Sequence, residues 1–232
     1  MGADPRGLRE TARTLKVLEP GARIQLVKAP FFTSGNWESE VDVVVFPGGR
    51  DLPYVEALAG EGCRRIRDFV LAGGKYFGIC AGAYFGSQYI EFEKGEPLEV
   101  CGHRELGLYP GKAIGPLFEK NVFRYNSLEG ARATSIQWGV KTFQVFYHGG
   151  CTFEEVEHHE QVNVLARYAE LEGEPPAVIL SKVGKGKALL SGVHPEYSPS
   201  SCHKLPFAGE LFSSEGTRLP FLHNLWSLLI KD

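Results

Sequence analysis

Cys80 lies between two glycines in the stretch Gly78-Ile79-Cys80-Ala81-Gly82, directly after the apolar run KYFGI. A G-x-nucleophile-x-G pattern between a strand and a helix is typical of a nucleophile elbow, a tight bend that holds one reactive side chain. Glycines are needed there because the chain passes close to its neighbours. The positive end of the helix that follows favours the thiolate form of such a cysteine. The same pattern also fits a buried, unreactive thiol behind a turn of small residues.

A cysteine nucleophile needs a base, and the base needs a group that orients it. The stretch LLSGVHPEY offers both, because an apolar run ends in His194, Pro195 and Glu196. Pro195 biases His194 toward an extended backbone, in which residues two apart point the same way. Glu196 can therefore stand behind the imidazole. The sequence predicts a triad of Cys80, His194 and Glu196 in the roles of the Ser-His-Asp template.

A second glycine motif follows another apolar run, in VVVFPGG. Carboxyl ends of parallel strands gather at one edge of a sheet, so this loop is expected beside the triad. The backbone N–H groups of Gly48, Gly49 and Ala81 would then form an oxyanion hole. The alternative is an ordinary glycine turn.

The elements that must position these motifs alternate between strand and helix. Strands are predicted at residues 23–27, 39–49, 75–79, 161–168, 176–184 and 186–197, and helices at 5–18, 53–72, after residue 81 and at 216–230. This alternation predicts an α/β fold with a doubly wound, mostly parallel, flavodoxin-like sheet. Residues 1–232 are expected to form a single domain, with a β-rich insertion at about 90–150. Such folds usually begin with a strand, whereas this chain begins with a helix. Either a first strand is missing or the sheet is completed in another way.

Composition excludes several classes of function. The chain of 232 residues has 43% hydrophobic and 23% charged residues and a net charge of −3, and no basic run marks a nucleic-acid surface. No apolar stretch approaches the ~20 residues of a membrane helix, and the N-terminus has no secretory pattern. The sequence therefore predicts a cytoplasmic protein without nucleic-acid or membrane partners.

Cysteine and histidine spacing favours neither a disulfide framework nor a zinc site. The five cysteines are irregularly spaced, at positions 63, 80, 101, 151 and 202. His148 with Cys151 is the nearest approach to a metal pair, but a loop beside the active site explains that segment better. The adjacent histidines at 158 and 159 diverge on any regular element and fit an exposed turn. No metal is expected.

The strings FPGGRDLPY, GGKYFGICAGAYFGS, YHGG and LLSGVHPEY resemble the class I glutamine amidotransferase superfamily. They are most similar to the amidotransferase-like domain at the N-terminus of some biotin–protein ligases, over about residues 41–198. The resemblance implies that Cys80 attacks a small carboxamide, that His194 is the base and that Glu196 orients it. It also implies a thioester intermediate and no cofactor. A further set of residues is expected to line the substrate pocket: Arg50, Asp51, Tyr84, Tyr147, Gly149 and Gly150.

Two departures from that family pattern limit the expectation. Glutamine-hydrolysing members usually carry a glutamine four residues after the cysteine, and here that position is Tyr84. The glycine- and arginine-rich biotinyl-adenylate loop of biotin ligases is also absent, so biotin transfer by this chain alone is not expected. Three hypotheses therefore remain: an amide-cleaving cysteine enzyme, a module that binds a ligand or a partner such as a biotin–protein ligase, or a degenerate, structural member of the superfamily.

Overall fold

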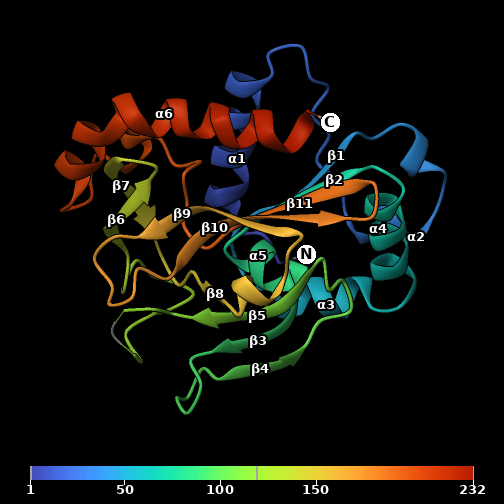
Figure 1. Cartoon of the computed structure of the whole chain (residues 1–232), viewed down its shortest axis with the longest axis horizontal. Coiled ribbons are helices and arrows are strands. Elements are labelled where there is room, and N and C mark those ends of the chain that lie inside the picture. The colour runs from blue at the N-terminus through green and yellow to red at the C-terminus, as the bar shows by residue number, and fades with distance from the viewer. Residues whose placement is uncertain (1, 119, 232) are drawn as a thin grey trace.

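The computed structural model describes residues 2–118 and 120–231, which form two sheets with helices packed around the larger one (Figure 1). The helices are α1 (Pro5–Leu18), α2 (Ala29–Thr33), α3 (Leu52–Leu58), α4 (Glu61–Leu71), α5 (Ala81–Gly86) and α6 (Ala208–Ile230). The strands are β1 (Val43–Phe46), β2 (Lys75–Ile79), β3 (Ser87–Phe92), β4 (Val100–His103), β5 (Tyr109–Gly115), β6 (Arg132–Trp138), β7 (Lys141–Tyr147), β8 (Thr152–Glu154), β9 (Val162–Tyr168), β10 (Pro176–Val183) and β11 (Gly186–Ser191).

The large sheet is mixed rather than mostly parallel. Its strand order is β1-β2-β11-β10-β9-β6-β7, and only β1, β2 and β11 run parallel to one another. The tight turn at residues 184–185 reverses β10 against β11, and the following pairs are antiparallel as well. The expectation of a mostly parallel sheet is therefore wrong. The apolar runs predicted burial on both faces, and helices supply that burial for antiparallel strands too.

Two further differences concern single segments. Residues 23–27 form no strand and pair with neither sheet. Leu26 in that segment is 64% exposed. The expected β-rich insertion is split in space. Its strands β4 and β5 join β3 and the later strand β8 in the small sheet β4-β3-β5-β8, whereas β6 and β7 belong to the large sheet.

Helix α1 begins where the sequence predicts. Asp4 caps it by accepting a hydrogen bond from the N–H of Gly7 at 2.7 Å, and Pro5 occupies the first helical position. Leu15 and Leu18 face the core beside α6. Figure 1 shows α1 and α6 on one face of the large sheet, with α3, α4 and α5 on the other.

The core is divided by strand β2. Tyr76 faces the side of α3, α4 and α5, whereas Phe77 and Ile79 face the side of α1 and α6. The strand is buried along its whole length. A strand covered on both faces reads as a continuous apolar run, which is why it is easily recognised in the sequence. It also gives the residue after it a rigid support.

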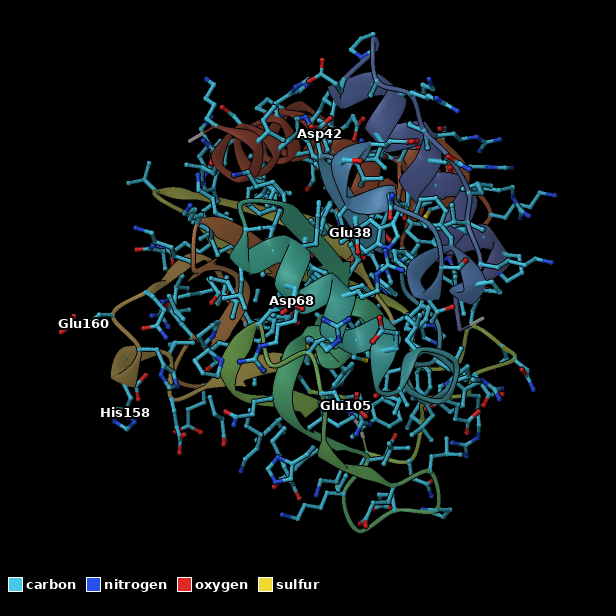
Figure 2. All side chains as sticks on the ribbon, turned by 90° about the vertical axis from the view of Figure 1, so that its right-hand side faces the viewer. Glu38, Asp42, Asp68, Glu105, His158 and Glu160 are labelled. Carbon is cyan, nitrogen blue, oxygen red and sulfur yellow. The ribbon has the colours of Figure 1, made fainter. Side chains whose placement is uncertain are left out.

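Two of the three arginines of α4, Arg64 and Arg65, form local ion pairs. Arg65 pairs with Glu38 at 2.6 Å, and Arg64 pairs with Asp68 at 2.7 Å. Figure 2 shows Glu38, Asp68 and Glu105 on this face. The paired arginines therefore form no free basic patch of the kind that nucleic acids need.

Candidate active site

Cys80 occupies a strained bend between β2 and α5. Its backbone has φ 50° and ψ −105°, a region that residues with a side chain rarely adopt. The Cys80 N–H donates to the carbonyl of Ser191 at 2.8 Å, so the bend is fixed to β11. A Cβ on Gly82 would lie 2.0 Å from the carbonyl oxygen of Phe46, so only glycine lets α5 approach the end of β1 this closely. Strain of this kind costs about 1–3 kcal/mol and is typical of functional sites.

His194 and Glu196 follow β11 and lie beside this bend. The Nδ1 atom of His194 is 2.7 Å from Oε1 of Glu196, and both side chains are buried. The backbone N–H of His194 donates to the carbonyl of Phe146 at 2.9 Å, which fixes the turn after β11 to β7. The Cys80 side chain lies beside the same imidazole and helps to raise its pKa. Because Nδ1 contacts Glu196, Nε2 is the nitrogen that remains for Cys80.

The surroundings of His194 favour its charged form. Burial by itself lowers the pKa, but the Glu196 carboxylate and the Cys80 side chain outweigh burial and hold the pKa of His194 well above its usual range. His148 differs, because burial lowers its pKa to about 4 and leaves it neutral near pH 7. The carbonyl of His148 lies 3.6 Å from Sγ of Cys80. One of the two histidines is thus poised to carry a proton, and the other is not.

Gly48 and Gly49 lie next to the triad, as the sequence suggests. A Cβ on Gly48 would be 2.6 Å from Cε1 of His194 and 3.5 Å from Cβ of Cys80. Within residues 2–118 and 120–231, the N–H groups of Gly48, Gly49 and Ala81 have no hydrogen-bond acceptor. Free N–H groups around a nucleophile are what an oxyanion hole requires.

Replacement of Gly48 by alanine tests this close approach. We expect the new methyl group to displace the imidazole and to slow alkylation of Cys80 by about 10- to 100-fold, since a misplacement of ~1 Å can cost that much. The rate constant is measured by mass spectrometry. Gly21→Ala is the matched control, because no atom lies within 4 Å of its added Cβ. An unchanged rate in Gly48→Ala would contradict the contact.

A small pocket opens beside Cys80, with a volume of about 20 Å³. That is room for about one water molecule. The residues that line it are Gly49, Asp51, Cys80, Ala81, Tyr84, Phe92, Phe123, Tyr125 and Gly149. Among the residues expected in the pocket, Asp51, Tyr84 and Gly149 are therefore part of the lining.

The other three expected residues lie around this pocket rather than in its lining. Arg50 stands at the edge, with its guanidinium 4.3 Å from the ring centre of Tyr125. Tyr147 is buried behind the pocket and donates a hydrogen bond to the carbonyl of Gly150 at 3.0 Å. Arg50 thus contacts the loop that contains Tyr125, whereas Tyr147 contacts the loop that contains Gly150.

Tyr84 fills the position at which glutamine-hydrolysing members carry a glutamine. Its hydroxyl is 3.1 Å from the carbonyl of Gly150 and 3.3 Å from that of Gly149. Burial raises the pKa of Tyr84 well above its usual range, so the hydroxyl stays neutral and donates. Tyr84 therefore anchors the loop of Gly149 and Gly150 and narrows the pocket beside Cys80.

Sequence reasoning missed the aromatic wall formed by Phe92, Phe123 and Tyr125. These residues come from the end of β3 and from the connection between β5 and β6. Their rings contact one another at centroid distances of 4.9–6.0 Å. Two aromatic residues in the polar stretch NVFRYNS were the signal that could have indicated a buried loop.

Asp51 forms a buried ion pair that the sequence did not reveal. Nε of Arg104 is 2.7 Å from Oδ2 of Asp51, and the two side chains are only 5% and 10% exposed. The pair ties α3 to the end of β4 at the base of the pocket. Breaking a buried pair leaves one charge without a partner, which is costly.

Replacement of Arg104 by methionine should therefore destabilise the fold by about 3–5 kcal/mol. Urea denaturation followed by circular dichroism measures this loss. Arg64→Met is the matched control, because Arg64 is 59% exposed in its own ion pairs, and its unfolding midpoint should hardly move. Equal midpoints for both variants would show that the buried pair contributes little.

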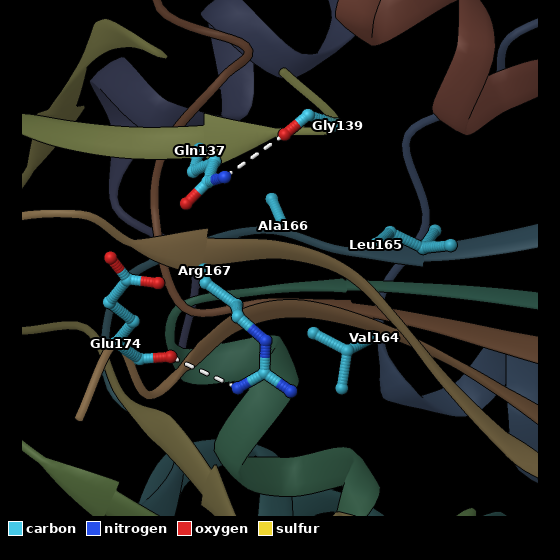
Figure 3. Close-up of a pocket in the computed structure, with 7 residues that line it drawn as sticks. All are labelled: Gln137, Gly139, Val164, Leu165, Ala166, Arg167 and Glu174. Carbon is cyan, nitrogen blue, oxygen red and sulfur yellow. Dashed lines mark hydrogen bonds between the residues drawn. The ribbon is translucent and has the colours of Figure 1, made fainter. Parts of the chain in front are cut away.

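A larger hollow, of about 270 Å³, lies away from the triad between β9 and the turn after β6 (Figure 3). Figure 3 shows that two of its polar side chains, Gln137 and Arg167, form local hydrogen bonds. Gln137 donates to the carbonyl of Gly139 at 3.1 Å, and Arg167 donates to that of Glu174 at 3.0 Å.

The described part of the chain also holds no group of three metal-binding side chains. His158 and Glu160 point outward from the loop before β9 (Figure 2), so they do not converge on a site. In the same part of the chain, no helix has the length and apolar character needed to span a bilayer.

Comparison with known proteins decides the family. A profile of the family described as "Biotin-protein ligase, N terminal" matches residues 1–229. The chain belongs to this family. The resemblance seen in the sequence motifs is thereby confirmed, and it extends beyond residues 41–198.

Two curated relatives of this biotin–protein ligase N-terminal chain illustrate the family. An uncharacterized protein of Chlamydia muridarum is 39% identical over 207 residues, which are 87% of this chain and 79% of that protein. A biotin–protein ligase of Schizosaccharomyces pombe is 36% identical over 229 residues, which are 96% of this chain and 35% of the ligase. The chain thus spans about a third of that ligase.

Solved structures show that the fold of this family member is glutamine amidotransferase-like. A glutamine amidotransferase superimposes with a TM-score of 0.63 at 22% identity, covering 99% of this chain and 95% of the other. PurLQS from Thermotoga maritima gives 0.58 at 16% identity, with 94% of each chain covered. At such low identity these structures establish the fold alone.

Proposed function

We propose that this chain is a cysteine-dependent amidohydrolase or amidotransferase-like enzyme acting on a small carboxamide. The observation that carries the proposal is the buried cluster of Cys80, His194 and Glu196 at a strained bend, in which Glu196 contacts the imidazole at 2.7 Å. Strain, an oriented base and free backbone donors in one place fit nucleophilic catalysis better than packing. The reducing cytoplasm is the compartment that we propose for it, because that environment keeps Cys80 a free thiol.

The reaction proceeds in two halves. Sγ of Cys80 attacks the carboxamide carbon, and the N–H groups of the Gly49 loop and Ala81 bind the oxygen that becomes negative. The C–N bond then breaks, and His194 gives its proton to the departing amine. Water attacks the resulting thioester, His194 takes a proton from it, and the acid leaves as the Cys80 thiol reforms. Glu196 keeps the imidazole oriented throughout.

The first test is labelling with chloroacetamide across the range of about pH 6 to 9, followed by peptide mass spectrometry. Burial raises the pKa of Cys63 to about 12 and of Cys202 to about 11, and it also raises the pKa of Cys101 and Cys151. These four thiols should therefore react slowly. Cys80 should be labelled first, and His194→Ala should remove this preference.

Exposed Cys101 is the one site where background labelling is expected, so Cys101→Ser is the reference protein. Slow labelling spread over the remaining cysteines, unaffected by His194→Ala, would contradict the proposed nucleophile. If Cys80 is selectively labelled, ammonia release from glutamine and other primary amides identifies the substrate. Tyr84 predicts that glutamine is not the best of them.

A second candidate function is a regulatory binding module. The observation that favours it is the pocket of about 20 Å³, narrowed by Tyr84, which holds little more than a water molecule. In this alternative the partner is a biotin–protein ligase, because one relative carries the same domain within such an enzyme. Saturable binding of a ligase to both wild-type protein and Cys80→Ala, without ammonia release by either, would favour this function.

A further inference from the structure

Residues 2–4 pair with the loop that follows β1 through an isolated β-bridge. Ala3 and Gly49 pair as an antiparallel bridge. The Asp4 N–H donates to the carbonyl of Gly48 at 2.9 Å, and the Arg50 N–H donates to the carbonyl of Gly2 at 2.8 Å. The contact is close, because a Cβ on Gly49 would lie 2.1 Å from the carbonyl oxygen of Gly2.

This pairing determines where the Gly49 N–H points. A trans peptide group is planar, and its C=O and N–H point in opposite directions. The carbonyl of Gly48 faces the N–H of Asp4, so the N–H of Gly49 in the same peptide group faces the other way. Gly49 lines the pocket with Cys80 and Ala81 on that side. The bridge therefore keeps one free donor pointing away from Asp4, in a peptide group beside the pocket that Cys80 also lines.

The same segment continues into α1, which reaches the other half of the triad. The Thr14 hydroxyl donates to the carbonyl of Glu196 at 2.8 Å. Arg6 donates to the carbonyl of Ser201 at 2.6 Å, and its guanidinium lies 5.2 Å from the ring centre of Tyr197. We call residues 2–18 the N-terminal arm. It binds both the glycine loop and the turn that carries His194 and Glu196.

We propose that the N-terminal arm positions the oxyanion hole, with the Asp4 N–H as the group that orients the Gly48–Gly49 peptide. This inference rests on the proposed function, because the oxyanion hole matters only if Cys80 attacks a carbonyl. Asp4 is a positioning residue and contacts no substrate. Its backbone, rather than its side chain, carries the effect.

Two variants at one position separate these contributions. Asp4 has φ −65°, which proline adopts without strain. Asp4→Pro removes both the N–H and the capping carboxylate, whereas Asp4→Ala removes the carboxylate alone. The comparison between them isolates the hydrogen bond to Gly48. Gly2→Val forms a second pair with Gly21→Val, because a Cβ on Gly2 would lie 2.1 Å from the carbonyl of Arg50 and one on Gly21 meets nothing within 4 Å.

Two reactions of Cys80 serve as readouts. Iodoacetamide alkylation displaces iodide at a saturated carbon and needs no oxyanion hole. With 4-nitrophenyl acetate, Sγ attacks the carbonyl carbon, a C–S bond forms and 4-nitrophenolate leaves. The carbonyl oxygen carries a negative charge in the intermediate.

Removal of one hydrogen-bond donor from an oxyanion hole typically lowers the rate constant by about 100- to 1,000-fold. We expect Asp4→Pro to slow acylation at least ~10-fold relative to Asp4→Ala, since the donor is misdirected rather than removed. The rate constant for alkylation should stay within ~2-fold of the wild-type value in all four variants. The rate constant for acylation should fall in Gly2→Val but not in its control Gly21→Val.

Equal ratios of acylation to alkylation in Asp4→Pro and Asp4→Ala would overturn the inference while leaving the proposed function in place. Absence of acylation at Cys80 in the wild-type protein would overturn both. Hydrogen exchange at the Arg50 amide gives a test that is independent of chemistry. Faster exchange in Asp4→Pro than in Asp4→Ala would support the bridge, and equal exchange would contradict it.

Discussion

Replacement of Cys80 by alanine should abolish amide turnover and selective labelling, while the protein keeps its fold. The physical reason is that no other described thiol lies against His194, and loss of the nucleophile removes the covalent route entirely. Ammonia release and far-ultraviolet circular dichroism, measured on the same preparation, check both parts. Residual turnover within a few-fold of the wild-type rate would exclude the mechanism.

Stability of the Cys80 variants gives an independent result that needs no substrate. At φ 50° any side chain is strained, and glycine removes that strain. We therefore expect Cys80→Gly to be more stable than Cys80→Ala by about 1–2 kcal/mol in urea denaturation. Cys151 supplies the matched pair, because it is fully buried but has no positive φ. We expect Cys151→Gly to be less stable than Cys151→Ala. If Cys80→Gly were also less stable than Cys80→Ala, the backbone at Cys80 would store no strain.

The second large effect is expected from Glu196→Gln. The Glu196 carboxylate is the main cause that raises the pKa of His194, so its loss should lower that pKa and reduce the imidazolium fraction near neutral pH. We expect Cys80 alkylation near pH 7 to slow by at least ~10-fold, in line with typical acid–base contributions. The titration of the His194 Cε1 proton, followed by NMR, should move to lower pH.

Exposed Glu210 offers the control for this charge change, because Glu210→Gln removes the same charge from the surface of α6. Its titration curve and alkylation rate should match those of the wild-type protein. An unchanged His194 titration in Glu196→Gln would mean that the carboxylate does not stabilise the imidazolium. The 2.7 Å contact would then only orient the ring.

Local patterns predicted more of this protein than its topology. Helix α1, strands β1 and β2 and the hairpin of β10 and β11 follow directly from apolar spacing and turn residues. The direction of the remaining strands could not be predicted from the sequence. An apolar run indicates that a strand is buried, but not which strand lies next to it or in which direction that strand runs. Residues 23–27 have the composition of a strand but no sheet edge to join. The aromatic wall is a long-range assembly of Phe92 with Phe123 and Tyr125, and the local sequence NVFRYNS indicates only that two of its aromatic residues could be buried, not what they contact.

The chemical types and local bends of the site can be predicted from the amino-acid sequence: a cysteine between glycines, a His-Pro-Glu turn and a glycine pair after a buried run. These depend on contacts between near neighbours, which spacing records. Only the tertiary structure decided the width of the pocket, the anchoring role of Tyr84, the buried partner of Asp51 and the bridge between residues 2–4 and the glycine loop. Each of these joins segments distant in the chain, and their packing and hydrogen bonds depend on how the whole fold brings them together.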